Sequence, residues 1–141
     1  MLNLASGLVL EIGVGSGLNL PQYGPEVLRV VGLDPSSELL HLARKRVAQA
    51  LVPVSLVRAS AQSIPFADTA FDAIVMTWTL CSISNPNAVL VEMRRVLKTG
   101  RSVAFRRTRP VAGNPRCSLA ARADTVLEAH QRRMSPESQD G

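Results

Sequence analysis

The fold of this chain is decided by the stretch LVLEIGVGSGLNLPQY, Leu8–Tyr23, in which an apolar run leads into three glycines on alternate positions. A short run of Leu, Val and Ile that ends in glycine is typical of a buried parallel strand. Glycine adopts backbone angles that other residues avoid, and it presents no Cβ to an approaching ligand. Gly13, Gly15 and Gly17 therefore predict a bare loop after the strand, which serves either as a tight turn or as a ligand site.

Outward from this stretch, strand and helix patterns alternate along the chain. Apolar runs predict further strands at residues 27–34, 54–60, 71–80 and 101–105. Two amphipathic segments predict helices between them: one has Ser36 or Ser37 as its N-cap, and the other has Asn85 as N-cap and Pro86 at its first position. This order indicates an α/β fold, a Rossmann-like, open and mostly parallel sheet with flanking helices.

Each predicted helix has one apolar face that should pack on the sheet. The first face carries Leu39, Leu40, Ala43, Val47 and Leu51. The second carries Val89, Leu90, Met93, Val96 and Leu97, and Gly100 lies beyond the expected helix end. Phe66 and Phe71 are expected in the core because aromatic residues in apolar runs usually pack there.

Length and charge divide the chain into two parts. The 141 residues, 46% of them hydrophobic, suit one domain, which we place at residues 1–105, followed by a basic, poorly patterned tail at residues 106–141. Residues 1–98 carry eight basic and seven acidic side chains, and residues 99–141 carry eight and four, so most of the net charge of +5 belongs to the end of the chain. No aromatic residue lies within residues 106–141, so we favour a solvated tail over an RNA-binding arm and expect no nucleic-acid partner.

Several other function classes are not supported by the sequence. No apolar stretch reaches the roughly 20 residues of a membrane-spanning helix, and no basic segment precedes a signal-like core, so a cytoplasmic protein is expected. Cys81 and Cys117 match no metal-site spacing and are expected to be free thiols. His41 and His130 have no recognisable acidic partner, so we assign no catalytic histidine and no metal site.

The class of ligand follows from Asp34, which lies 21 residues after Gly13 at the end of the second predicted strand. A carboxylate there can accept hydrogen bonds from both hydroxyls of a ribose, although it could instead cap the following helix. A dinucleotide loop needs a small residue where Leu18 stands, and a phosphate-binding P-loop needs Lys and Ser or Thr where Leu18 and Asn19 stand. A nucleoside ligand without phosphates therefore fits best.

Four segments in order resemble a known family, the class I S-adenosylmethionine-dependent methyltransferases. They are LEIGVGSG, GLDPS, ASAQSIPFADTAFDAIV and MRRVLKTG, spread over roughly residues 8–100. The segment TWTLCSI most resembles the small-molecule branch that includes quinone-biosynthesis, thiol and phospholipid methyltransferases. The resemblance implies S-adenosylmethionine as cofactor, a small-molecule methyl acceptor and a reaction without an obligatory nucleophile, so the catalytic residues remain unassigned.

The resemblance also implies a role for individual residues. Asp34 would hold the ribose, and Thr77 and Trp78 would border the methyl group and the acceptor. Glu11 would orient the glycine loop or reach the cofactor's amino group through water. The other candidate cofactor-binding residues are Gly13, Gly15, Gly17 and Asn19 in the loop, Pro35 and Ser36 beside the adenine, and Ser60, Ala61 and Gln62 at the adenine edge.

The chain departs from the family pattern at both ends, so it is expected to be truncated there. Only seven residues precede Leu8, where the family usually has further helices, and the strand pattern fades after Gly100. The fading is explained either by a divergent tail or by a shift of reading frame near Gly100. Two other functions remain open: a catalytically incompetent remnant that binds the cofactor, and a nicotinamide-dependent oxidoreductase, which Leu18 disfavours. An exposed final strand would favour a homo-oligomer.

Overall fold

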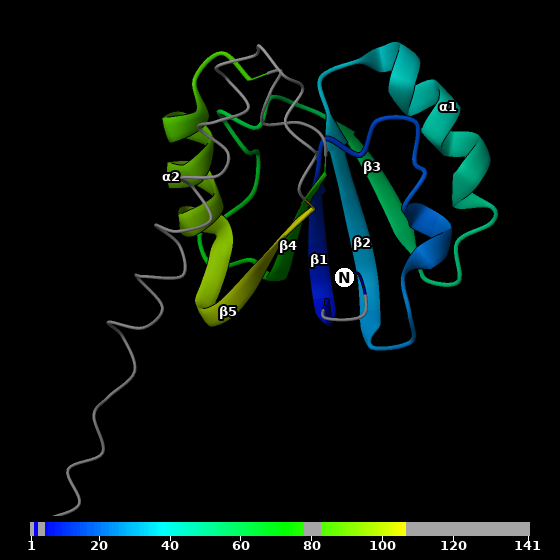
Figure 1. The fold of residues 1–141 in the computed structure, drawn as a ribbon, viewed down its shortest axis with the longest axis horizontal. Helices are drawn as coiled ribbons and strands as arrows, with labels where there is room; N and C mark the ends of the chain where they lie inside the picture. The colour runs from blue at the N-terminus through cyan, green and yellow to red at the C-terminus, as the bar shows by residue number, and fades with distance from the viewer. Residues whose placement is uncertain (1, 3–4, 78–82, 107–141) are drawn as a thin grey trace, which may run out of the picture. The chain divides into compact units, whose positions relative to one another are not determined.

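Five strands form one sheet in the order β3-β2-β1-β4-β5, and each strand is parallel to its neighbours (Figure 1). The computed structural model describes residues 2, 5–77 and 83–106. The strands are β1 Gly7–Ile12, β2 Val27–Asp34, β3 Val54–Arg58, β4 Phe71–Thr77 and β5 Leu97–Arg106. The predicted α/β fold class is therefore confirmed. The predicted tail at residues 106–141 lies outside the described residues except for Arg106.

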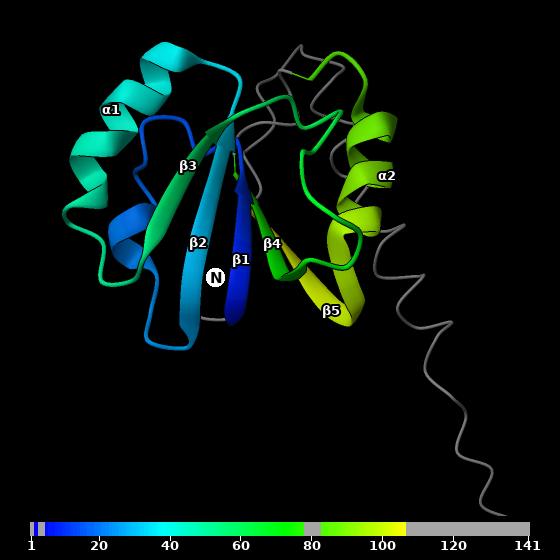
Figure 2. The same ribbon diagram turned by 180° about the vertical axis from the view of Figure 1, so that it is seen from behind.

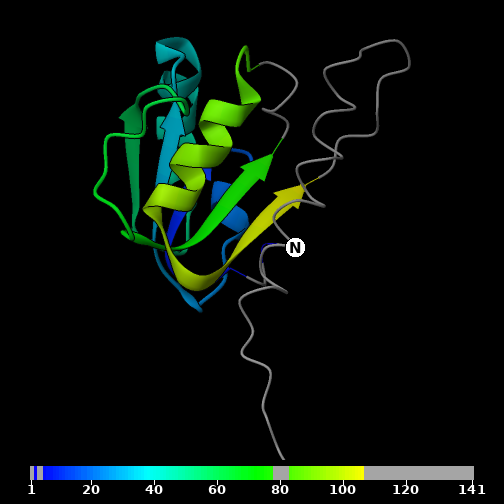
Figure 3. The ribbon, with the colours of Figure 1, turned by 90° about the vertical axis from the view of Figure 1, so that its left-hand side faces the viewer.

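Helices α1 and α2 cover opposite faces of the sheet. Helix α2, Pro86–Val96, packs on one face through Val89, Met93 and Val96, all fully buried. Helix α1, Ser37–Val47, packs on the other face together with the short 3-10 helix η2, Leu20–Gln22. Figures 2 and 3 show this arrangement from behind and from the side of β5. Among the described residues, no helix is long and apolar enough to cross a membrane.

Both predicted helix starts are confirmed by hydrogen bonds at the caps. Ser36 Oγ accepts a hydrogen bond from the backbone N–H of Leu39, and Asn85 Oδ1 accepts one from Ala88. These side chains satisfy backbone donors that the first helical turn leaves without a partner. Pro86 occupies the first turn of α2, where its missing N–H costs nothing.

Three details of the predicted helix faces are wrong. Helix α1 ends at Val47, so Leu51 lies beyond it and is 81% exposed, and Leu39 is 39% exposed. Leu97 does not end α2 but begins β5, which follows the helix with no intervening loop. Gly100 lies beyond the end of α2, as expected, and inside β5 with φ of +75°, a conformation that glycine adopts without strain.

A pair of charged residues on α2 ties this helix to the segment between β3 and β4. Arg95 Nε and Nη2 each donate to one carboxylate oxygen of Glu92, both at 2.8 Å. Nη2 also donates to the Ile64 carbonyl, and Nη1 donates to the Phe66 carbonyl and to Asp68. All five guanidinium donors are therefore used. Glu92 in turn accepts the backbone N–H of Ile64 at 2.7 Å.

The Glu92 carboxylate makes the stability of this attachment depend on pH. The hydrogen bonds from Arg95, and then that from the Ile64 backbone, lower the pKa of Glu92 from its usual 4.5 to about 2. A lowered folded-state pKa stabilises the folded state above the unfolded pKa, and this stabilisation fades as the pH falls from about 4.5 toward 2. We expect Glu92→Gln to lower the melting temperature at pH 7 and the difference from the unmodified chain to shrink steadily below pH 4.5. Thermal unfolding followed by circular dichroism at several pH values measures this, and a constant difference would contradict it.

The strand order places a reversal point beside β1. The chain moves from β1 outward to β2 and β3, and then returns to the other side of β1 to form β4 and β5. Ligands of open parallel sheets bind outside the carboxyl ends of the strands at such a point. The glycine loop that follows β1 and Asp34 at the end of β2 both lie there.

Candidate functional site

A hollow of about 170 Å³ opens at the carboxyl ends of the strands. It is lined by Ile12, Gly13, Leu33, Pro35, Ser60, Ala61, Gln62, Ile83 and Ser84. Five of these were predicted as site residues, namely Gly13, Pro35, Ser60, Ala61 and Gln62. None of the nine carries a charge. A dry cavity of about 150 Å³ is enough to hold benzene, so this hollow suits a flat, uncharged ring system.

The last two glycines of the glycine loop have different structural roles. Gly15 has φ of +54°, and a Cβ built on it would meet nothing closer than 4.0 Å, so its outer side is open. Gly17 has φ of +81°, and a Cβ there would lie 2.9 Å from Leu20 Cδ1 and 3.2 Å from Ala43 of α1. Gly15 therefore leaves room for a ligand, whereas Gly17 allows close packing beneath the loop. Leu18 is 65% exposed and takes no part in that packing.

The open side of Gly15 gives a direct test of ligand approach. Gly15→Ala adds one methyl group where the folded chain has space, so the cost is that of a left-handed alanine, about 1–2 kcal/mol of folding free energy. The new Cβ would occupy the surface over which a ligand lies, so we expect nucleoside affinity to fall at least tenfold. Calorimetric titration and thermal unfolding measure the two effects. Unchanged affinity would show that no ligand touches this glycine.

The carboxylate of Asp34 holds the loop and the start of α1 together. Its Oδ2 accepts the backbone N–H of Gly15 at 3.0 Å, and its Oδ1 accepts the N–H of Ser36 at 2.9 Å. The bond from Ser36 agrees with the alternative in which Asp34 supports the helix start, and the role of Asp34 as a ribose ligand stays a prediction. Each carboxylate oxygen can accept two hydrogen bonds, so Asp34 retains acceptor capacity for two ligand hydroxyls.

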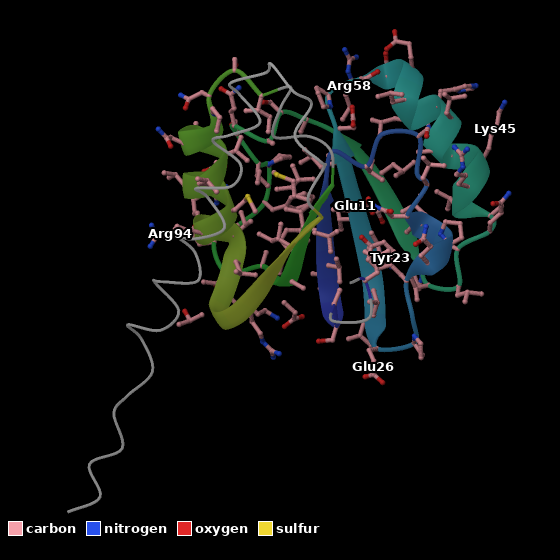
Figure 4. All side chains as sticks on the ribbon, in the orientation of Figure 1. Glu11, Tyr23, Glu26, Lys45, Arg58 and Arg94 are labelled. Carbon is pink, nitrogen blue, oxygen red and sulfur yellow. The ribbon has the colours of Figure 1, made fainter. Side chains whose placement is uncertain are left out.

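Glu11 lies on the opposite face of β1 from the hollow and is completely buried. One carboxylate oxygen accepts a hydrogen bond from Asn19 Nδ2 and the other from the Tyr23 hydroxyl, both at 2.8 Å. Figure 4 shows Glu11 and Tyr23 near each other beside β1 and β2. Burial raises the pKa of Glu11, and the two hydrogen bonds oppose that rise. Burial and the Glu11 carboxylate also raise the pKa of Tyr23.

These contacts separate the predicted site residues into two groups. Glu11 and Asn19 form a network beneath the glycine loop, and the adenine-edge candidates line the hollow. Thr77 is the last residue of β4, and its backbone pairs with Arg106 of β5. Trp78 lies outside the described residues.

The sequence reasoning missed residues that reach the site from distant parts of the chain. Arg46 of α1 donates from Nη1 to the Ser16 carbonyl at 2.6 Å and so fastens the glycine loop. Ile83 and Ser84 form the side of the hollow that precedes α2. Tyr23 alone had a usable signal, because a buried tyrosine needs a hydrogen-bond partner for its hydroxyl.

Comparison with known proteins finds similar sequences across the residues that form the sheet and the hollow. A family model described as a methyltransferase domain matches residues 10–105. A phosphatidylethanolamine N-methyltransferase from Cereibacter sphaeroides is 39% identical over 105 residues, which are 73% of this chain and 51% of that protein. A demethylmenaquinone methyltransferase from Renibacterium salmoninarum is 33% identical over 92 residues, 65% of this chain and 37% of the relative. The chain thus spans about half or less of the length of these curated relatives.

The fold is shared with solved structures. The crystal structure of an S-adenosylmethionine-dependent methyltransferase from Aquifex aeolicus superposes with a TM-score of 0.70 at 26% identity. That match covers 91% of this chain and 73% of the solved one. The family match ends at residue 105, five residues past Gly100, so the similarity continues beyond the point where the strand pattern fades.

Proposed function

The chain belongs to the class I S-adenosylmethionine-dependent methyltransferases, and on that premise we propose that it binds this cofactor above β1 and β2 and transfers its methyl group to a small molecule. The observation that carries the proposal is the bond from Gly15 to Asp34, which joins an open glycine loop to a carboxylate at the end of the next strand. Such a pair suits a ligand with both a ribose and a chain that lies along bare backbone.

The residues of the site fit the proposed cofactor. The hollow beside Asp34 is uncharged and large enough for a flat ring, which suits adenine. Ser60, Ala61 and Gln62 would meet the adenine edge, Pro35 and Ser36 would flank it, and Asp34 would hold the ribose hydroxyls. Glu11 and Asn19 would act from beneath by fixing the loop that carries Gly13, Gly15 and Gly17, since Glu11 has no opening to the hollow.

The same geometry argues against a dinucleotide. Pyrophosphates bind at the N-terminus of a helix that follows the glycine loop, where several backbone N–H groups point at the anion. Here only the three-residue helix η2 follows the loop, and Leu18 projects into solvent. No basic side chain lines the hollow. A nicotinamide cofactor would therefore lack partners for its phosphates at this place.

The chemistry asks little of the protein beyond positioning. The bound cofactor supplies a methyl group on a positively charged sulfur, which is already a good leaving group. The chain would hold the ligand on the glycine loop and bring an acceptor atom in line with the methyl carbon. Such orientation can lower the activation barrier by about 7–11 kcal/mol. Thr77 and Trp78, at and after the end of β4, are the proposed neighbours of the acceptor.

The acceptor is proposed to be a small molecule. The two relatives described above are named for methylation of a phospholipid headgroup amine and of a quinone precursor, and both names support this class. We further propose that the chain acts in the cytoplasm, where Cys81 and Cys117 would stay reduced, and without a nucleic-acid partner. A homo-oligomer through the outer edge of β5 is the proposed assembly, because β5 pairs only with β4 among the described strands.

Calorimetric titration with S-adenosylmethionine, S-adenosylhomocysteine and NAD tests the proposal. Binding of the two sulfur nucleosides and not of NAD is expected. Methyl transfer to an amine, thiol or quinol acceptor would establish the enzyme. Binding without turnover on any acceptor would indicate a remnant that only holds the cofactor. Binding of NAD alone would overturn the assignment.

A further inference from the structure

One wall of the hollow is formed by the segment that connects β3 to β4. Ser60, Ala61 and Gln62 of this segment line the hollow. The segment is anchored just before them, where the Ala59 N–H donates to the Asp34 carbonyl at 3.3 Å. Beyond them, Ile64 and Phe66 are bound by Glu92 and Arg95 as described above. The wall is therefore held on both sides of the residues that face the ligand.

A second hydrogen bond joins the residues just before α2 to this wall. Ser84 lies two residues before Pro86, the first residue of α2, and its Oγ accepts a hydrogen bond from Gln62 Nε2 at 3.0 Å. Together with the backbone of α2, these bonds form a closed ring from Gln62 to Ser84, along α2 to Arg95, and back to Ile64. A ring closed in this way would couple the position of residues 60–62 to the attachment at the far end of α2.

We propose that the pair formed by Glu92 and Arg95 is a positioning element of the ligand site, which holds the wall at residues 60–62 in its binding geometry before the ligand arrives. This inference rests on the proposed nucleoside site and adds to it two residues that lie outside the hollow. A wall that is already ordered costs the ligand less free energy on binding.

The hydrogen bonds at position 95 depend on the planar shape of the arginine side chain. The five donors of Arg95 are fixed in one plane and reach four groups at once, whereas lysine has three donors at a single point. Lysine would keep the charge and lose most of these bonds. The neighbouring Arg94 offers a matched control, because it is exposed and extends away from the body of α2 in Figure 4.

The test compares Arg95→Lys with Arg94→Lys in the full chain, well below both melting temperatures. We expect Arg95→Lys to weaken S-adenosylhomocysteine binding about tenfold, since loosening one wall adds an ordering cost of about 1.4 kcal/mol, and Arg94→Lys to leave affinity unchanged. Hydrogen exchange without ligand gives an independent measurement. The Gln62 and Ser63 amides bond to Ser60 rather than to the pair, so their faster exchange in Arg95→Lys alone would report motion of the wall itself.

Each outcome decides the inference. Equal affinity and equal exchange in the two lysine variants would overturn it and leave the pair a purely structural attachment. If Arg95→Lys does not fold, Glu92→Gln replaces it and must show the same two changes at smaller size. If the unmodified chain fails to bind S-adenosylhomocysteine, the proposed function fails, and the exchange of Gln62 and Ser63 alone then decides whether the pair holds the wall.

Discussion

Asp34→Ala is expected to lower the affinity for S-adenosylhomocysteine about a hundredfold. In the proposed site the variant would remove the acceptor of two ribose hydroxyls, and since hydrogen bonds to a charged group contribute about 1.5–3 kcal/mol each, a hundredfold loss is the lower end of the expected range. It also leaves the N–H groups of Gly15 and Ser36 without their acceptor. Calorimetric titration measures the affinity, and circular dichroism confirms that the variant remains folded during the titration.

The control for this prediction is Asp72→Asn. Asp72 also accepts a backbone N–H, that of Leu8 at 2.9 Å, but it does so near the starts of β1 and β4, away from the hollow. Both variants remove a carboxylate that accepts backbone N–H groups, so both should lower the melting temperature. Only Asp34→Ala should change affinity strongly. Affinity within a factor of about three of the unmodified chain would exclude Asp34 as a ribose ligand.

Gly17→Val is expected to destabilise the folded chain by about 3–5 kcal/mol, which can unfold a domain of this size at physiological temperature. Two costs add. The branched side chain would have to adopt φ of +81°, and its Cβ would lie 2.9 Å from Leu20 and 3.2 Å from Ala43. Relief would require α1 to move away from the sheet. Urea unfolding followed by circular dichroism measures the free energy.

Substitutions at two other glycines separate the backbone cost of Gly17→Val from the cost of its steric clash. Gly24 has no atom within 4 Å of a built Cβ and no positive φ, so Gly24→Val should cost much less. Gly15→Ala carries the backbone cost without the clash and should lie between the two. If Gly17→Val and Gly24→Val were equally stable, the contact between the glycine loop and α1 would not limit stability.

The sequence allowed the central strands of the sheet to be predicted well because most residues of β1, β2 and β4 are buried. The run that became β2 was predicted at residues 27–34, and the structure has Val27–Asp34. Such continuous apolar runs identify strands without knowledge of their neighbours. The start of β5 was missed because α2 passes into it at Leu97 without a turn, and Gly100 looked like a helix terminator rather than a residue within a strand.

The contacts that shape the hollow could not be predicted in the same way. Nothing local distinguishes Arg94 from Arg95, because the difference depends on which one faces a segment about 30 residues earlier in the chain. Likewise, the position of α1 decides that Gly17 is closely packed whereas Gly15 is open. The sequence pattern predicted which residue types gather at the strand ends, and only the fold could reveal which of them touch.

The central position of β1 has a consequence for the order in which the chain can acquire its shape. One side of β1 pairs with β2, about twenty residues later, but the other pairs with β4, and the Leu8 N–H bonds to Asp72, 64 residues away. During synthesis one edge of β1 would therefore remain unpaired until β4 leaves the ribosome. Contacts so distant along the chain slow folding and prolong exposure to aggregation.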